Sequence, residues 1–361
     1  MDISKIDINL ASGEVDENIE WISSHDERFS VHGVFFSEKD NLYMRVPDEI
    51  SEATGNPAIR TLARMTSGGR IRFITNSQFI AINASLPAVR PAPHMPLTLT
   101  HGFSVYADGL YKKRYSPKTN TLLEVKEFGM EKRICFTEKK EIDETSKERL
   151  IEIYFPLYGG VSQLHIGVAP GSIVKKAPDY ERKKPLLFYG SSITQGACVS
   201  RPGNDYVSML ARKFNSDYIN LGFSGNGNAE DAMIDYITSI DASLYAFDYN
   251  MYASRKERIL PPHFSIYERI REKHPNALIL LHDKPGCDFE PDPEREEIIR
   301  STYEKAVKLG DELVCYIPPK ALLGEGDRDC CMVDNSHPND LGAWRMSNTI
   351  FNEISEKLSK I

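Results

Sequence analysis

Two short stretches, far apart in the sequence, carry side chains that could act together as a nucleophile, a base and an acid. Ser192 follows the apolar run Leu186–Tyr189 and the strand-breaking Gly190. Near the other end of the chain, Asp334 precedes His337 by three residues, directly before a helical pattern. A serine hydroxyl is a weak nucleophile until a base removes its proton, and a carboxylate can fix the orientation of that base. The order Ser, Asp, His therefore predicts acyl-transfer chemistry.

Each stretch also has an ordinary structural interpretation. Gly190-Ser191-Ser192 is a common loop tripeptide, and serine favours turns and helix caps. The second stretch is followed by Asn339, which is a good N-cap residue for the last helix. What favours chemistry is that both stretches lie at the ends of elements in one alternating β/α pattern.

From Pro185 onward, five short apolar runs alternate with helical patterns. The first of these patterns places Val207, Leu210, Ala211 and Phe214 on one face of a helix. The runs expected to form strands are Leu186–Tyr189, Tyr218–Leu221, Ser243–Phe247, Ala277–Leu281 and Leu313–Ile317. Strands alternating with helices imply right-handed crossovers and a parallel sheet covered on both faces. Ligands bind at the carboxyl edge of such a sheet, where Ser192 is expected.

The first half of the chain has a different period. Several short alternating runs are separated by turn signals such as Asp108-Gly109, with little helical pattern between them. The runs expected to form strands include Ile71–Thr75, Phe79–Ile82, Leu97–Thr100, Phe103–Tyr106, Arg133–Phe136, Leu150–Phe155 and Val161–Val168. This pattern favours an antiparallel β-sandwich. We expect the sandwich over residues 1–175, a linker over 176–185 and the α/β domain over 186–361.

Four segments together resemble the conserved blocks of the SGNH (GDSL-like) hydrolase family. Blocks one to four are Tyr189–Gly196, Asn220–Gly227, Phe247–Tyr252 and Asp334–Pro338. The resemblance runs from about Pro185 to the C-terminus and is closest to bacterial members that carry an N-terminal β-sandwich. It implies a flavodoxin-like three-layer α/β/α hydrolase domain with a parallel sheet, preceded by a jelly-roll-like antiparallel β-sandwich. Upstream, residues 107–111 (Ala-Asp-Gly-Leu-Tyr) resemble the Gly-x-Asp-Leu-Tyr signature of that N-terminal domain.

The resemblance also implies a role for each site residue. Ser192 matches the family nucleophile, His337 the base, and Asp334 the carboxylate that orients the base. The backbone N–H groups of Ser192 and Gly225 match two donors of the oxyanion hole, which stabilises the negative charge that develops on the substrate oxygen. Glycine at position 225 suits the close approach of backbone to a ligand.

The chain departs from the family pattern in two places. Block one usually has Asp before the nucleophile, where this chain has Ser191. Block three usually reads Gly-x-Asn-Asp, where this chain reads Asp-Tyr-Asn-Met-Tyr over residues 248–252. The third oxyanion donor is then the Asn250 side chain, or the Tyr252 hydroxyl in its place, or it is missing.

Composition limits the classes of partner. The chain has 361 residues, 41% of them hydrophobic and 27% charged, as in ordinary globular proteins. Its net charge of −8 argues against a nucleic acid partner, and no apolar stretch approaches the length of a membrane span. The first residues lack a basic start followed by an apolar core, so we expect no signal peptide and a cytoplasmic protein. Six irregularly spaced cysteines favour free thiols over a disulfide framework.

The expected function is that of a serine esterase that hydrolyses a small ester through an acyl-enzyme. Because SGNH chains with a sandwich often act on acylated sugars, the resemblance implies O-deacetylation of a carbohydrate, with a small-molecule or oligosaccharide ester as the substrate. We expect no cofactor and no metal. One alternative is a carboxylesterase or thioesterase for esters other than those of carbohydrates. Another is a catalytically impaired relative that binds carbohydrate, an alternative that the unusual block three favours.

Overall fold

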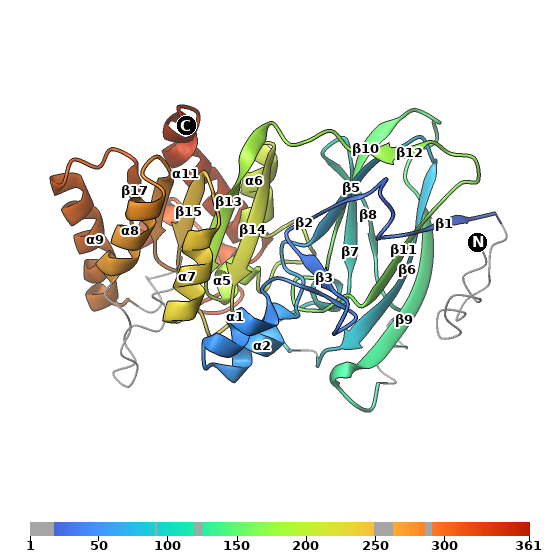
Figure 1. The fold of residues 1–361 in the computed structure, drawn as a ribbon, viewed down its shortest axis with the longest axis horizontal. Helices are drawn as coiled ribbons and strands as arrows, with labels where there is room; N and C mark the ends of the chain where they lie inside the picture. The colour runs from blue at the N-terminus through green and yellow to red at the C-terminus, as the bar shows by residue number, and fades with distance from the viewer. Residues whose placement is uncertain (1–17, 91, 119–120, 122–124, 249–262, 286–290) are drawn as a thin grey trace. The chain divides into compact units, whose positions relative to one another are not determined.

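The computed structural model describes residues 18–90, 92–118, 121, 125–248, 263–285 and 291–361 (Figure 1). Their internal contacts divide the chain into two compact units. Unit one consists of Met1–Arg45, Arg64–Asp179 and Ser200–Gly203. Unit two consists of Val46–Ala63, Tyr180–Val199 and Asn204–Ile361. Within the described residues no disulfide joins the cysteines.

Unit one is built from antiparallel sheets, as the short alternating runs predict. One sheet has the order β1-β11-β6-β9 and the other the order β12-β5-β10-β7-β8, with β2 paired to β5. The strands of the first sheet are β1 (Glu20–Ser23), β11 (Gln163–Val168), β6 (Phe79–Ala88) and β9 (Gly129–Glu141). The strands of the second are β12 (Val174–Lys176), β5 (Arg70–Thr75), β10 (Arg149–Tyr154), β7 (Phe103–Ala107), β8 (Leu110–Tyr115) and β2 (Ser30–His32). A separate hairpin joins β3 (Phe35–Ser37) to β4 (Leu42–Met44).

Alternate residues of several of these strands enter one apolar core. In β5, for example, Ile71 and Phe73 lie in the core, and in β6 Ile80 and Ile82 do so. This period of two follows from the alternation of side chains between the two faces of a strand. The Asp108-Gly109 turn between β7 and β8 has positive φ at both residues, 50° and 76°, as a tight hairpin turn requires.

The predicted strand at Leu97–Thr100 is wrong. The segment forms a short helix, α3 (Leu97–Thr100), and the chain turns sharply just after it. A Cβ atom on Gly102 would lie 2.2 Å from the Thr98 carbonyl oxygen, so the backbone folds back on itself here. Apolar and hydroxyl residues alternate in the four-residue run, but a segment of four residues is too short for alternation alone to distinguish a strand from a helical turn.

Unit two contains a parallel five-stranded sheet, as predicted. Its strand order is β14-β13-β15-β16-β17, which in chain order is 2-1-3-4-5, the flavodoxin-like arrangement. The strands are β13 (Arg182–Gly190), β14 (Ser216–Gly222), β15 (Leu244–Phe247), β16 (Leu278–His282) and β17 (Val314–Ile317). All neighbouring pairs are parallel. The strand order reverses between β13 and β15, and at such a switch point the carboxyl edge of a sheet opens into a crevice.

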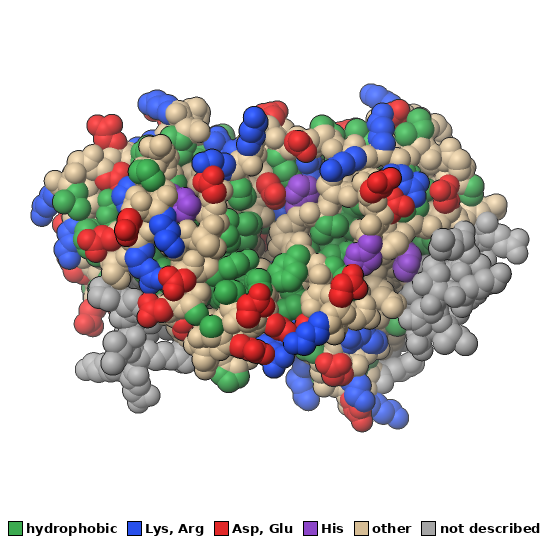
Figure 2. Space-filling view, in the orientation of Figure 1, with side chains coloured by type: hydrophobic (Ala, Val, Ile, Leu, Met, Phe, Trp, Pro, Cys, Tyr) green, Lys and Arg blue, Asp and Glu red, His purple; other side chains and the backbone are tan. Residues whose placement is uncertain are grey.

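Helices pack in two groups against this sheet. One group contains α6 (Tyr206–Lys213), α10 (Pro319–Leu322) and α11 (Asp340–Leu358); the other contains α7 (Asp231–Ser239), α8 (His263–Lys273) and α9 (Pro293–Lys308). Two helices from the first half of the chain, α1 (Asp48–Ala53) and α2 (Pro57–Ala63), also belong to unit two, and α1 packs on α7. None of the helices among the described residues is both long and apolar enough to cross a membrane. The face in Figure 2 carries acidic and basic side chains interspersed.

Candidate active site

The predicted nucleophile lies in a tight turn at the carboxyl end of β13. Ser191 caps the short helix α5 (Ser192–Gln195), and its hydroxyl accepts a hydrogen bond from the Ile193 N–H at 3.1 Å. Ser192 is the first residue of this helix and is almost fully buried. The turn has no room for a side chain at Gly190, because a Cβ atom there would lie 1.3 Å from Oδ1 of Asp248.

The predicted base and acid lie in a closed loop before α11. The Val333 N–H donates to the His337 carbonyl at 2.9 Å, and Met332 and Pro338 form an isolated antiparallel bridge. Asn339 caps α11 by accepting from the backbone N–H groups of the helix's first turn, as predicted from its sequence position. The cap and the predicted acid–base pair therefore occupy one loop, so the ordinary interpretation of this stretch does not exclude the functional one.

Hydrogen bonds connect the three predicted catalytic side chains in order. Ser192 Oγ lies 2.9 Å from His337 Nε2, and His337 Nδ1 lies 2.9 Å from Asp334 Oδ2. A carboxylate can only accept, so Nδ1 carries a proton, and in the neutral imidazole Nε2 then presents a lone pair to the Ser192 hydroxyl. This is the protonation state in which an imidazole can remove a proton from serine.

Asp334 is held as a carboxylate. Partial burial raises the pKa of its carboxyl group, but hydrogen bonds from the His337 side chain and from the backbone N–H groups of Ser336 and His337 outweigh this effect, so the pKa lies below its usual value. The two backbone donors contact Oδ1 at 2.8 and 2.7 Å, which leaves Oδ2 for the imidazole. Both carboxylate oxygens of Asp334 therefore accept hydrogen bonds, which fix the orientation of the side chain.

A thiol near the same carboxylate is not a rival nucleophile. Burial raises the pKa of Cys198 to about 12, and the charge of Asp334 adds to this rise. Only the thiolate form of cysteine is a good nucleophile. At neutral pH Cys198 is therefore held in the thiol form, and the serine hydroxyl remains the candidate.

Block two forms a loop that packs against the nucleophile turn. The Phe223 N–H donates to the Gly190 carbonyl at 2.8 Å, and the Ser224 N–H donates to the Gln195 side chain at 2.9 Å. Gly225 follows with a positive φ of 69°, a conformation that glycine adopts without strain. These contacts place the predicted oxyanion donors, Gly225 and Ser192, on adjoining loops; their catalytic roles remain predictions. Asn250 and Tyr252, the two candidates for the third donor, lie outside the described residues.

Two contacts of the site escaped the sequence reasoning. Asp248, which directly follows β15, bonds to Ser191, the residue that departs from the family pattern in block one. The Asn204 side chain donates to Asp340 at 2.9 Å and so ties the loop after α5 to the start of α11. The available signal for Asp248 was its place directly after a predicted strand of the parallel sheet.

Part of the loop after α5 belongs to unit one. There the guanidinium of Arg201 lies 3.6 Å from the centre of the Tyr111 ring and donates a hydrogen bond to the Tyr106 hydroxyl at 2.7 Å. Tyr111 is the tyrosine of the segment that resembles the Gly-x-Asp-Leu-Tyr signature. Arg201 comes nine residues after Ser192, so these two tyrosines anchor the loop that follows the predicted nucleophile.

Comparison with known families agrees with both halves of this description. Residues 183–355 match the model of the GDSL-like lipase/acylhydrolase family, and residues 19–174 match the model for the N-terminus of SGNH hydrolase-type esterases. The SGNH resemblance is confirmed. These GDSL-like matches support an ester-hydrolysing enzyme. No curated protein matches the chain in sequence.

Solved structures share the two-part architecture of this GDSL-like chain. A protein from Bacteroides ovatus described as a GDSL-like lipase is 25% identical, with 95% of this chain and 98% of that chain covered and a TM-score of 0.77. SsfX3, a salicylyl-acyltransferase from a tetracycline biosynthetic pathway, is 18% identical over 94% and 98% of the chains, with a TM-score of 0.72. A family two carbohydrate esterase from Cellvibrio japonicus is 13% identical over 94% and 98%, with a TM-score of 0.58. The last two likenesses concern the fold alone.

Proposed function

We propose that this chain is a serine esterase that removes a small acyl group, an O-acetyl group of a carbohydrate, through an acyl-enzyme. The observation that carries the proposal is the unbroken chain of hydrogen bonds from Ser192 through His337 to Asp334, with distances of 2.9 Å at both steps. In this proposal Ser192 is the nucleophile, His337 the general base and acid, and Asp334 the group that orients the imidazole. The carbohydrate is supported only by the architecture that the chain shares with carbohydrate esterases.

The first half of the proposed reaction forms the acyl-enzyme. Ser192 Oγ attacks the carbonyl carbon of the ester while its proton passes to His337 Nε2. The carbonyl oxygen becomes an oxyanion that accepts hydrogen bonds from the N–H groups of Ser192 and Gly225 and from the Asn250 side chain. The tetrahedral intermediate then collapses, and His337 returns the proton to the departing alcohol oxygen. The Asp334 carboxylate stabilises the imidazolium that exists between these two proton transfers.

The second half releases the acid. Water takes the place of the alcohol, His337 removes a proton from it, and the resulting nucleophile attacks the acyl carbon. Collapse of the second tetrahedral intermediate breaks the bond to Ser192 Oγ, which recovers its proton from His337. The net reaction consumes one water and yields one alcohol and one carboxylic acid.

The test compares substrates that share an acetyl group but differ in the group that carries it. p-Nitrophenyl acetate reports whether the serine turns over at all, and the size of its burst counts the acyl-enzyme. Acetylated oligosaccharides and an acetyl thioester then report the preferred leaving group. A kcat/KM that is highest on the acetylated sugar supports the proposal; a preference for the thioester or for simple esters favours the alternative class of esterase.

Two further outcomes concern the fate of the acyl group. If added alcohols capture the acyl group faster than water does, the chain is an acyltransferase, the activity named for the structurally similar SsfX3. If acetylated sugars bind but no acetate is released and no burst occurs, the chain is a binding relative without turnover. In that case the hydrogen-bonded Ser192, His337 and Asp334 would have no catalytic role.

A further inference from the structure

Asp248 occupies the position next to the nucleophile turn at the switch point of the sheet. It directly follows β15, and β15 pairs with β13 so that Phe247 lies beside Tyr189. Asp248 therefore stands one residue beyond the last pair, level with Gly190. The residue is only 2% exposed. A carboxylate in such a place is costly unless several donors satisfy it.

Ser191 supplies two of those donors from a single residue. Its backbone N–H lies 2.6 Å from Asp248 Oδ1, and its hydroxyl donates to Asp248 Oδ2 at 2.8 Å. The same hydroxyl accepts from the Ile193 N–H in the first turn of α5. The carboxylate thus fixes both the backbone and the side chain of the residue immediately before Ser192. Glycine at 190 leaves the space in which the carboxylate lies.

The surroundings explain why the carboxylate needs these donors. Burial raises the pKa of Asp248, whereas the charge of His282 and the hydrogen bonds from Ser191 and Thr194 act against this rise. His282 ends β16, the strand next to β15. Ser191, Asp248 and His282 therefore follow one another along the carboxyl edge of the sheet. The site therefore contains a buried acid that the Ser192–His337–Asp334 chain does not use.

We propose that Asp248 is a positioning residue that holds the nucleophile turn in the conformation in which Ser192 Oγ points at His337. The inference rests on the proposed function of Ser192 as nucleophile. It also gives one physical reason for both departures from the family pattern. Block one has serine where the family has aspartate, and block three has aspartate where the family has glycine, so the carboxylate and the small residue have exchanged strands.

A second aspartate of unit two provides a matched control. Asp205 is also buried, at 1% exposure, and accepts hydrogen bonds from one serine in the same two ways: from the Ser208 N–H at 2.8 Å and from the Ser208 hydroxyl at 2.6 Å. It caps α6, and among the described residues no hydrogen bond or ion pair joins its side chain to the nucleophile turn. Asp205→Asn should therefore reproduce the structural consequences of Asp248→Asn without the catalytic one.

The experiment measures kcat and KM on p-nitrophenyl acetate, together with the rate at which a fluorophosphonate labels Ser192. In Asp248→Asn the amide can still accept from the Ser191 N–H but cannot accept from the Ser191 hydroxyl. We expect kcat and the labelling rate to fall by about 10- to 100-fold per folded molecule with KM little changed, as for a displacement of the nucleophile. Asp205→Asn should keep both rates within about twofold while losing a similar amount of stability.

The outcomes separate the two proposals. If the wild type labels and turns over but Asp248→Asn behaves like Asp205→Asn, Asp248 is purely structural and the positioning role is wrong. A wild type that neither labels nor hydrolyses any ester overturns the proposed function and the positioning role with it. Because Asp248→Asn could unfold, the exchange Ser191→Asp/Asp248→Gly is compared with Asp248→Gly alone. We expect the added Ser191→Asp substitution to raise the labelling rate at least tenfold above that of Asp248→Gly alone. If it does not, the idea that the carboxylate and the small residue have exchanged strands is wrong.

Discussion

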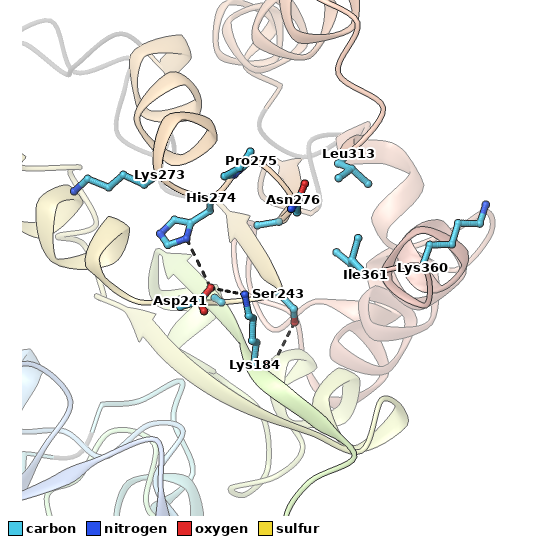
Figure 3. A pocket seen from close by; sticks show the side chains of 12 residues that line it. Lys184, Asp241, Ser243, Lys273, His274, Pro275, Asn276, Leu313, Lys360 and Ile361 are labelled. Carbon is cyan, nitrogen blue, oxygen red and sulfur yellow. Dashed lines mark hydrogen bonds and ion pairs between the residues drawn. The ribbon is translucent and has the colours of Figure 1, made fainter.

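The two edges of the parallel sheet both contain a serine, a histidine and an aspartate, but the hydrogen bonds among the three differ between the edges. At the carboxyl edge Ser192, His337 and Asp334 are joined in that order. At the amino edge a cavity of about 530 Å³ is lined by residues that include Ser243, His274 and Asp241 (Figure 3). Composition alone does not distinguish the two sets.

The hydrogen bonds do distinguish them. His274 Nε2 lies 2.9 Å from the Thr238 carbonyl and Nδ1 lies 3.8 Å from Asp241, so both ring nitrogens face acceptors. The Ser243 hydroxyl donates to backbone carbonyls of residues 184 and 185 instead of to the imidazole. No nitrogen of His274 is therefore presented to a serine proton, and the amino-edge set cannot activate a nucleophile. A catalytic triad requires a particular order of hydrogen bonds, since the same three residue types occur at both edges.

The largest expected difference between the edges is that between their serines. Ser192→Ala removes the nucleophile and should lower kcat by about 10⁵- to 10⁶-fold with little change in melting temperature. Ser243→Ala should leave kcat within about twofold of the wild type. Both rates are measured on p-nitrophenyl acetate.

Ser191→Ala is the control for the position of the nucleophile in the chain. It loses a helix cap, worth about 1 kcal/mol of stability, and one of the two bonds to Asp248, but should retain a readily measurable rate. If Ser191→Ala is inactive and Ser192→Ala is active, the nucleophile is Ser191 and not Ser192.

The second difference concerns the carboxylates. Asp334→Asn should slow kcat by up to about 10⁴-fold, because the amide no longer enforces the tautomer with the proton on Nδ1. Asp241→Asn, at the amino edge, should have no effect on the rate. Because the pKa of Asp334 is lowered, the loss of kcat in Asp334→Asn relative to the wild type should be equally large at neutral and at mildly acid pH. Any stability that this interaction supplies is present above the carboxyl's unfolded-state pKa and is lost as the pH falls through the lower folded-state pKa.

The pH profile of kcat/KM checks that assignment. The wild type should lose activity towards acid pH as the imidazole base takes up a proton, whereas Asp334 stays ionised there. Full activity in Asp334→Ala would reduce this carboxylate to a feature of the helix start.

The third prediction concerns the oxyanion donor in block three. Asp248 follows β15 directly and stands where the family pattern has its glycine, so the asparagine of that pattern coincides with Asn250. Asn250→Ala should lower kcat by about 10²- to 10³-fold with KM little changed, because the interaction strengthens in the transition state. Steady-state kinetics of Asn250→Ala and Tyr252→Phe decide between the two donors. If only Tyr252→Phe loses activity, the assignments exchange; if neither does, the hole has only its two backbone donors.

The fourth prediction concerns the loop anchored in unit one. Arg201→Ala removes the cation–π contact with Tyr111 and the bond to Tyr106, together worth about 0.5–2 kcal/mol. We expect kcat/KM to fall by about 2- to 30-fold as the loop after the nucleophile loosens. Lys139→Ala removes another cation–π contact of unit one, 4.1 Å from the Phe79 ring centre, and should not change kcat/KM. Equal rates in both variants would mean that the anchor serves stability alone.

Much of the fold could be predicted from hydrophobic periodicity. The strands β14 to β17 lie within one or two residues of their expected bounds, because each is a buried apolar run, whereas β13 begins four residues earlier than expected, at Arg182. The short helices α1, α2 and α3 were missed or mistaken, since a helix of four to seven residues shows too few repeats of its period.

The candidate site likewise has a part that could be predicted from the sequence and a part that could not. Ser192, Asp334 and His337 could be predicted because each lies at an element end and matches a local motif. The Asp248–Ser191 contact joins residues 57 positions apart and depends on which strands are neighbours at the switch point. A single sequence gives the strands but not the side-chain packing between their ends, so this part of the site needed the structure.

The smallest expected effect belongs to the amino-edge cavity. Lys184 donates to Asp241 at 2.8 Å across the mouth of this cavity, and both side chains are more than half exposed. A solvated ion pair of this kind contributes about 0–1 kcal/mol. Lys184→Met should therefore shift the melting temperature by a few degrees at most and leave kcat and KM on every tested ester unchanged, as thermal unfolding and steady-state kinetics would show. A loss of activity in Lys184→Met comparable to that of Arg201→Ala would mean that the amino edge communicates with Ser192, and the contrast between the two edges would then no longer hold.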